Sequence, residues 1–302
     1  MTSETDNRHR LATAPIVVGV DGTTTCENAI RWAADTAAHR GRRLHLVHGL
    51  GLTSMRSVLG SYDVMEPAVT ESLRTRGERM LAAAVRTARE VAPEVTIATE
   101  LTEEDPAAHL ITLSESAHMV VLGARAGAGT LSHLGSTLLK VAAHGHGAVV
   151  VVHDTDPLPA LGPVVVGVDG SGVGVSALAA AFEEAAERDA ELRAVHAWSD
   201  LEEGAFAGAD YLLIPIEDGE TAERAVLAER LAGFQEKYPD VTVVREVHPN
   251  GPRRHLAAHS AVARLVVVGS RGRGGFHGLL LGSTSLWIMQ HAGCPVMIVH
   301  PE

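Results

Sequence analysis

Residues 15–50 read PIVVGVDGTTTCENAIRWAADTAAHRGRRLHLVHGL, and residues 163–198 read PVVVGVDGSGVGVSALAAAFEEAAERDAELRAVHAW. The two stretches align without a gap at an offset of 148 residues, and 15 of their 36 positions are identical. Each begins with a short β-branched run, continues through an alanine-rich stretch of helical length and ends in a second apolar run. This order predicts a strand, a helix and a second strand, which is the repeating unit of a parallel sheet.

The rest of each half repeats as well. MVVLGAR at 119–125 matches LVVVGSR at 265–271, and LGSTLLKVAAHGHGAVVVVH at 134–153 matches LGSTSLWIMQHAGCPVMIVH at 281–300. A repeat of this length is too long for a solenoid unit, so the chain contains a duplicated domain. Continuous apolar strands that alternate with helices indicate a parallel sheet covered on both faces. The predicted fold class is α/β, with two tandem, Rossmann-like domains that each contain a five-stranded parallel sheet.

The repeat also predicts the domain organisation. We expect a disordered N-terminal tail at 1–14, a first domain at 15–153 and a second domain at 163–302. The Asp- and Pro-rich residues 154–162 lie between them and have the composition of a linker.

Composition limits the classes of partner. The 302 residues carry a formal net charge of −12, which disfavours nucleic acid and anionic membranes as partners. A small anionic ligand stays compatible with this charge, because a local nest of backbone N–H groups can bind it. The two cysteines are far apart, the polar start lacks a secretory pattern, and no apolar run approaches the roughly 18 residues of a membrane helix. We therefore expect a cytoplasmic protein.

Ligands of an open α/β sheet bind beyond the carboxyl ends of its strands, so the residues at those ends are the candidates for a site. The candidates after the first two strands are Asp21, Gly22, His48 and Gly49 in the first half and Asp169, Gly170, His196 and Ala197 in the second. The fourth strand of the second half is followed by GSRGRGGFHGLLLGSTS at 269–285, which contains six glycines and ends in a cluster of hydroxyls. Glycine there would either allow an unusual turn or let a ligand approach the backbone.

The spacing of this stretch favours a ligand. Gly269, Gly272, Gly282 and Ser283 form a G-x2-G-x9-G-[ST] pattern that resembles the nucleotide-binding motif of the universal stress protein family. The VVGVDGS start, the VHAW strand and the CPVMIV final strand resemble that family too, and the tandem form looks like its two-domain members in actinobacteria. The resemblance covers nearly the whole chain. It implies a fold similar to the adenine nucleotide alpha hydrolases and ATP as the ligand, with the presence of Mg²⁺ left open.

The resemblance also implies roles for individual residues. The loop residues predicted to hold the phosphates are Gly269, Arg271, Gly272, Gly282, Ser283 and Thr284. The last three open a helix, where free amides and the helix dipole attract an anion. The Ser283 hydroxyl would either cap that helix or bond a phosphate. In family members that bind ATP, the first-strand aspartate contacts ribose and backbone beside the second-strand histidine reads adenine, which implies those roles for Asp169 and Ala197, and for Asp21 and Gly49.

The first half has a weaker form of the loop, GARAGAGTLSHLGST at 123–137. Its candidate residues are Gly123, Gly127, Gly135, Ser136 and Thr137. Ala126 stands where the second glycine is expected, with only eight residues before Gly135, and a shift to Gly127 leaves seven. Alanine would be strained if the position needs a left-handed backbone, and its methyl group would intrude on the phosphate. We expect the first site to bind more weakly than the second.

Plainer interpretations compete with each of these. Glycine-rich loops also form tight turns, and Asp21 and Asp169 would serve as helix caps without any ligand. His48 and His196 lie at strand ends, where a structural role is favoured over a metal site. Cys26 lies near a helix start that could lower its thiol pKa, but an ordinary small apolar role is favoured.

The function predicted from these observations is a cytoplasmic, ATP-binding stress regulator that acts through nucleotide occupancy. The sequence lacks the G-x4-G-K-[ST], G-x-S-x-G and H-E-x-x-H patterns, which favours binding over catalysis. The alternatives are a slow ATPase or nucleotidyl-transferring enzyme, and a structural member of the family that binds no nucleotide. The repeat further predicts pairing of the two domains within the chain, with a homodimer as an additional possibility.

Overall fold

The computed structural model describes residues 13–53, 67–125, 134–154, 161–170, 174–197, 216–272 and 281–301. These residues form two compact units, which divide between residues 154 and 161 and are described separately below. Residues 1–12 of the predicted N-terminal tail and residues 155–160 of the predicted linker lie outside the described residues, whereas Ala14, the last residue of the predicted tail, is buried.

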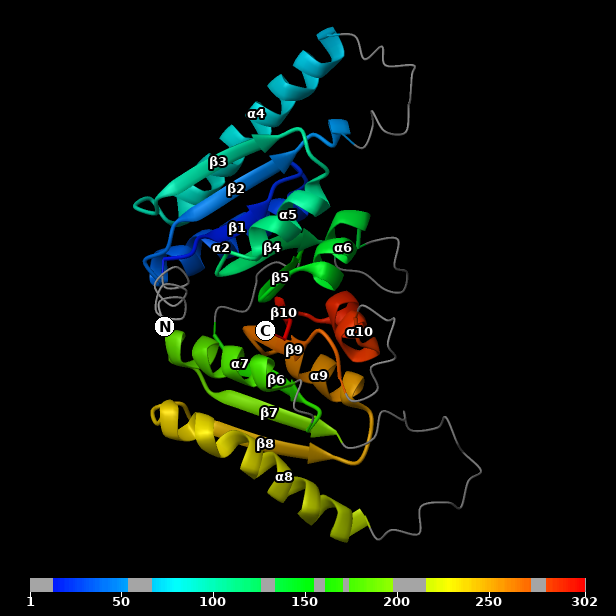
Figure 1. Cartoon of the computed structure of the whole chain (residues 1–302). Helices are drawn as coiled ribbons and strands as arrows, with labels where there is room; N and C mark the ends of the chain where they lie inside the picture. The colour runs from blue at the N-terminus through cyan, green and yellow to red at the C-terminus, as the bar shows by residue number, and fades with distance from the viewer. Residues whose placement is uncertain are drawn as a thin grey trace, which may run out of the picture. The chain divides into compact units, whose positions relative to one another are not determined.

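The first unit contains one parallel sheet with the strand order β3-β2-β1-β4-β5. Its strands are β1 (Ile16–Gly19), β2 (Leu44–Gly49), β3 (Ile97–Thr102), β4 (Met119–Ala124) and β5 (Ala148–His153). Helices α2 (Thr24–His39) and α4 (Pro67–Val91) cover one face of the sheet, and α5 (Pro106–Ser114) and α6 (Ser136–His144) cover the other (Figure 1).

The second unit repeats this arrangement with the order β8-β7-β6-β9-β10. Its strands are β6 (Val164–Val168), β7 (Leu192–Ala197), β8 (Val243–His248), β9 (Leu265–Gly269) and β10 (Val296–Val299). Helices α7 (Val175–Glu187) and α8 (Ile216–Lys237) pack on one face, and α9 (Pro252–Ser260) and α10 (Ser283–His291) pack on the other. The prediction of two α/β units with five-stranded parallel sheets is confirmed.

Register and burial explain why the strands read as unbroken apolar runs. Ile16 lies opposite Leu44 on β2 and Met119 on β4, and all three side chains are buried, because helices cover both faces. Parallel pairing brings the carboxyl ends of β1, β2 and β4 to the same edge of the sheet. The second unit repeats the register, with Val164 opposite Leu192 and Leu265.

Helix starts are set by local capping, and they differ between the units. Thr23 caps α2 by accepting a hydrogen bond from the Cys26 amide, whereas α7 begins after Gly174, the position that aligns with Cys26. In the first unit Asp105 accepts from the amides of Ala107 and Ala108 and so caps α5. Within the described residues, no helix has the length and apolarity needed to cross a membrane.

The packing between the first two helices of each unit also differs. In the second unit the buried ring of Phe182 on α7 stacks on Phe234 of α8 and on Tyr238, with ring centroids 5.4 Å and 5.8 Å apart. The aligned residues of the first unit include Ala34 and Ala88, both fully buried. The first unit therefore joins these helices through methyl groups, and the second joins them through aromatic rings.

Candidate functional site

The predicted loop of the second unit is closed at its base. The Gly282 amide donates to the Ser270 carbonyl at 2.7 Å, and the Ser270 amide donates to the Val299 carbonyl at 2.8 Å. These bonds hold the start of α10 against the carboxyl ends of β9 and β10. Residues 273–280, between the two ends of the loop, lie outside the described residues.

Two glycines of this loop lie close to other described residues of the same loop and helix start. A side-chain carbon added at Gly269 would lie 3.1 Å from the Arg271 carbonyl, and one added at Gly282 would lie 3.4 Å from Ser285 Oγ. Neither glycine has a positive φ. A left-handed turn is therefore not the reason for glycine at either position.

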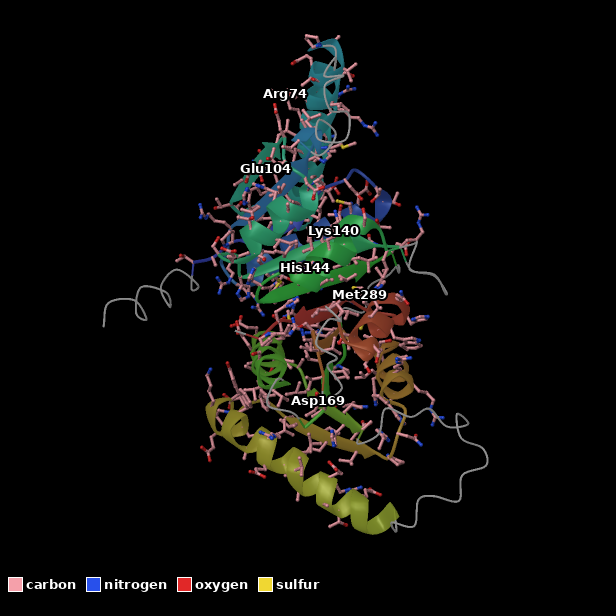
Figure 2. The ribbon with its side chains drawn as sticks, turned by 45° about the vertical axis from the view of Figure 1, so that its right-hand side comes forward. Arg74, Glu104, Lys140, His144, Asp169 and Met289 are labelled. Carbon is pink, nitrogen blue, oxygen red and sulfur yellow. The ribbon has the colours of Figure 1, made fainter. Side chains whose placement is uncertain are left out.

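Gly272 is the residue that joins the loop to the end of β6. A side-chain carbon added there would lie 3.2 Å from a carboxylate oxygen of Asp169, so the structure brings these two predicted site residues together. Asp169, labelled in Figure 2, directly follows β6 and is partly exposed. Gly272 has no positive φ, so a left-handed backbone is not the reason for glycine at this position. Glycine at position 272 avoids a close contact between a side chain and the Asp169 carboxylate, and this is the reason that remains.

The start of α10 lies against this loop, at Ser270 and Arg271. Gly282 is its N-cap and supplies no side-chain cap, and Ser283 is exposed, so capping by the Ser283 hydroxyl is not what the structure contains. A residue not predicted from the sequence fixes this helix start: buried Ser285 donates its hydroxyl to the Gly269 carbonyl at 2.6 Å. Thr284 is partly buried and Arg271 is exposed.

The turns after the first strand of each unit share one conformation. Gly22 and Gly170 have φ values of 75° and 74°, a left-handed backbone that disfavours other residues. In the first unit Asp21 accepts from the amide and the hydroxyl of Thr23, at 2.9 Å and 2.6 Å. Asp21 therefore supports the capping residue of α2 and is not the cap itself.

The first unit uses two of its predicted site glycines for packing. A side-chain carbon at Gly123 would lie 2.5 Å from the Thr25 carbonyl and 2.8 Å from the Cys26 amide, so the start of α2 occupies that space. One at Gly49 would lie 2.9 Å from backbone Cα of Pro106, where α5 begins. Ala197, the counterpart of Gly49, is a buried residue at the end of β7.

The helix after the first-unit loop opens differently from its counterpart. Gly135 is the N-cap of α6 with φ 73°, while Gly282 has φ −65°. Ser136 is exposed and Thr137 is partly buried at the first turn. Ala126 and Gly127 lie outside the described residues, so the predicted defect of this loop stays a prediction.

The first unit contains a cavity beside the turn that follows β1. It has a volume of about 250 Å³ and lies between α2 and α4, beside Gly22 and Thr23, with Met80 and Ala84 in its wall. Because α4 and α8 end the same five residues before β3 and β8, Ala84 aligns with Arg230. In the second unit the Arg230 guanidinium donates to the Gly170 carbonyl at 3.2 Å.

Cys26, His48 and His196 each contact a main-chain carbonyl at or next to the end of a strand. Burial raises the pKa of the Cys26 thiol to about 11, although backbone N–H groups near Asp21 oppose this, so the thiol is uncharged at neutral pH. His48 and His196 each bond the carbonyl at the end of the neighbouring strand, Val20 and Val168. Over the described ranges, no group of three or more His, Cys, Asp or Glu side chains could hold a metal ion.

Comparison with known proteins gives one consistent family. A family model described as the universal stress protein family matches residues 13–153 and 161–300. The chain is 40% identical over 293 residues to universal stress protein Rv2005c of Mycobacterium tuberculosis, covering 94% of this chain and 96% of that protein. It is 39% identical over 294 residues to a universal stress protein of Mycolicibacterium smegmatis, with 95% and 97% covered.

Solved structures share the fold across both units. The crystal structure of a universal stress protein from Archaeoglobus fulgidus matches with a TM-score of 0.69 at 18% identity, covering 95% of this chain and 98% of that chain. At this identity the match is a likeness of fold.

Proposed function

The chain belongs to the universal stress protein family, and from this premise we propose that it binds adenine nucleotides, ATP foremost, at the carboxyl end of the second sheet. Asp169 would take the ribose and the backbone at Ala197 the adenine. The phosphates would lie on Gly269, Gly272 and the start of α10. The first unit would bind through the corresponding residues, with lower affinity.

One observation carries this proposal: three separate chain segments meet around the same open backbone. The carboxylate of Asp169 lies beside Gly272, and the loop is closed by the Gly282–Ser270 bond where a helix of nine residues starts. Amides at a helix start and glycines without side chains are what a phosphate chain requires. A carboxylate beside this loop can accept hydrogen bonds from the hydroxyls of a ribose, whereas it would repel a phosphate.

The proposed role is regulatory, because the proposed site binds nucleotide and no residue in it is assigned as a catalytic base. Nucleotide occupancy would change the surface that Arg271 and the start of α10 offer to a partner protein. This makes the protein a cytoplasmic regulator in which ATP acts as the signal. The enzymatic alternatives, slow ATP hydrolysis and nucleotidyl transfer, predict steady release of ADP or AMP from purified protein supplied with ATP and Mg²⁺.

Mass spectrometry of nucleotide carried through purification separates the proposal from a structural member that binds none. Calorimetry with ATP then tests the site. Gly282→Val should abolish the tighter binding event, because its side chain fills the space at the helix start while its backbone conformation tolerates a side chain. Gly233→Val is the matched control, since a side-chain carbon there meets nothing within 4 Å and the residue lies on α8.

The outcomes are distinct. Unchanged ATP affinity in folded Gly282→Val overturns the site, and loss of affinity in Gly233→Val as well assigns the effect to stability. The predicted pairing of the two units stays a prediction, which sedimentation of the separately expressed halves would test: stable monomeric halves would contradict it.

A further inference from the structure

A buried histidine lies directly beneath the proposed second site. His196, at the end of β7, is 1% exposed. Its Nδ1 lies 2.7 Å from the Val168 carbonyl and its Nε2 lies 2.8 Å from a carboxylate oxygen of Glu223 on α8. The ring also reaches the turn that holds Asp169, since a side-chain carbon added at Gly170 would lie 3.7 Å from its Cε1.

The two contacts together fix the number of protons. A carbonyl oxygen only accepts, so Nδ1 carries a hydrogen and donates it to Val168. In neutral imidazole the other nitrogen then has a lone pair, which a carboxylate would repel. The contact between Nε2 and Glu223 therefore needs one more proton, shared by the pair either as imidazolium with carboxylate or as imidazole with carboxylic acid. When that proton leaves, attraction turns into repulsion.

Among the described residues packed around the ring, the other charged groups do not replace this proton. On the α8 side, Arg230 donates to the Gly170 carbonyl, and Arg245 of β8 is exposed beside Ala194. Asp169 lies at the end of β6, on the ligand side. His248 lies opposite Ala197, the neighbour of His196, and strand alternation therefore places it on the other face of the sheet.

The first unit lacks this device. His48 repeats the bond of its Nδ1 to the strand-end carbonyl, at 2.6 Å from Val20. The residue that aligns with Glu223 is Gly77, and a side-chain carbon there would lie 2.9 Å from the His48 ring. A carboxylate has no room at that position, so within the described residues the link through a shared proton is found in the second unit and not in the first.

We propose that Glu223 is a positioning residue which, through a proton shared with His196, couples nucleotide affinity at the second site to pH. This inference rests on the proposed function and adds its regulation. With the proton bound, the pair holds α8 against the turn at Asp169 and Gly170. Without it, the pair separates and leaves an unpaired negative charge close to an anionic ligand, so affinity falls as pH rises.

The structural half of the proposal is tested without nucleotide. Ring ¹⁵N spectra of the full chain, with amide spectra of Gly170, are recorded from pH 5.5 to 9. We expect loss of the Nε2 proton of His196 with increasing pH and a shift of the Gly170 amide over the same range. In Glu223→Gln the amide group can donate to neutral Nε2, so the Gly170 signal should not move with pH. Equal movement in both proteins overturns the proposal.

The functional half is tested by ATP affinity over the same pH range, in full-length Asp21→Ala protein so that the second site is measured alone. We expect affinity to fall roughly fivefold or more with rising pH, and Glu223→Gln to remove this dependence. Glu220→Gln is the matched control, because Glu220 is on the same helix and pairs with Arg224. A flat profile, or an equal slope in Glu223→Gln, overturns the coupling. If ATP fails to bind at every pH, the proposed function falls with it, while the Gly170 titration still decides whether the pair positions the turn.

Discussion

The two units share a strand order and register, yet they use the same glycine differently. Gly123 is the last residue but one of β4, and Gly269, which aligns with it, is the last residue of β9. A side-chain carbon added at Gly123 would lie 2.5 Å from the Thr25 carbonyl of α2, whereas one added at Gly269 would lie 3.1 Å from the Arg271 carbonyl of its own loop. The described contact of Gly123 therefore joins two elements of the first unit, and that of Gly269 lies within the loop. Two glycines at aligned positions are identical in sequence and are distinguished only by what they contact.

The sharpest test of the comparison concerns the helix pair that each unit packs on its sheet. Phe182→Ala should lower the free energy of unfolding of the second unit by about 3–5 kcal/mol, because it leaves a cavity against Phe234 and Tyr238. Hydrogen exchange of β6 and β7 amides measures this, and Phe182→Leu should cost less. The converse change Ala34→Phe should overpack the first unit and accelerate exchange there. If Phe182→Ala left exchange in β6 unchanged, the aromatic stack would not stabilise the unit.

Alanine at the two strand-end glycines gives the next largest effect. Gly123→Ala should destabilise the first unit by about 1–3 kcal/mol, because its methyl group must displace the backbone of Thr25. Gly269→Ala should destabilise the second unit less, because its methyl group meets the Arg271 carbonyl at 3.1 Å within one loop, and it should weaken ATP binding. Thermal unfolding and calorimetry on both variants separate the two outcomes. Equal destabilisation by both changes would contradict the assignment of Gly123 to packing.

Unequal nucleotide affinity is a smaller expected difference. Asp169→Ala should remove more bound ATP than Asp21→Ala, because Gly272 leaves room beside Asp169 whereas Ala126 adds a methyl group at the aligned position. We expect a several-fold to tenfold difference in affinity, with tenfold corresponding to about 1.4 kcal/mol. Equilibrium dialysis with labelled ATP measures it. A greater loss in Asp21→Ala would reverse the order of the sites.

The smallest predicted effect is a loss of stability at acidic pH. Burial tends to raise the pKa of Glu246, but the hydrogen bond and charge of His259 and the charge of Arg193 lower it below 4.5, so its contribution to stability is present above that pH and lost as pH falls. Burial, aided by the charge of His248, lowers the pKa of His255 below 6.5, and this contribution too is lost on acidification.

The second unit should therefore lose less than about 1 kcal/mol per group between pH 7 and 4. Glu246→Gln should reduce the fall in the second unit's free energy of unfolding at low pH. Glu229→Gln, an exposed change on α8, should not. In the first unit burial likewise lowers the pKa of His45, so both units should lose some stability when their buried histidines become protonated. A fall at low pH that Glu246→Gln leaves unchanged would remove that carboxylate from the explanation.

Sequence predicts the sheets because strand and helix periods are local properties, and the repeat confirms each assignment twice. It also predicts that the first-strand aspartate, the loop glycines and the helix start share one edge, since parallel strands bring their carboxyl ends together. It does not predict that Gly123 serves α2, that Ser285 bonds Gly269, or that Glu223 meets His196. Those depend on side chains far apart in the chain and on distances of a few tenths of an ångström.

The alanine and aromatic helix pairs have a consequence for the history of the chain. A duplicated gene invites recombination between its own copies, and the strand patterns of the two halves are similar enough to permit it. A crossover between the first and second helix would place Ala34 against Phe234 and Tyr238, or Phe182 against Ala88. The first product has a gap where a ring is missing and the second has a ring with no space, so neither packs densely. The interior thus acts as a barrier to exchange, and the two halves are free to keep diverging in what they bind.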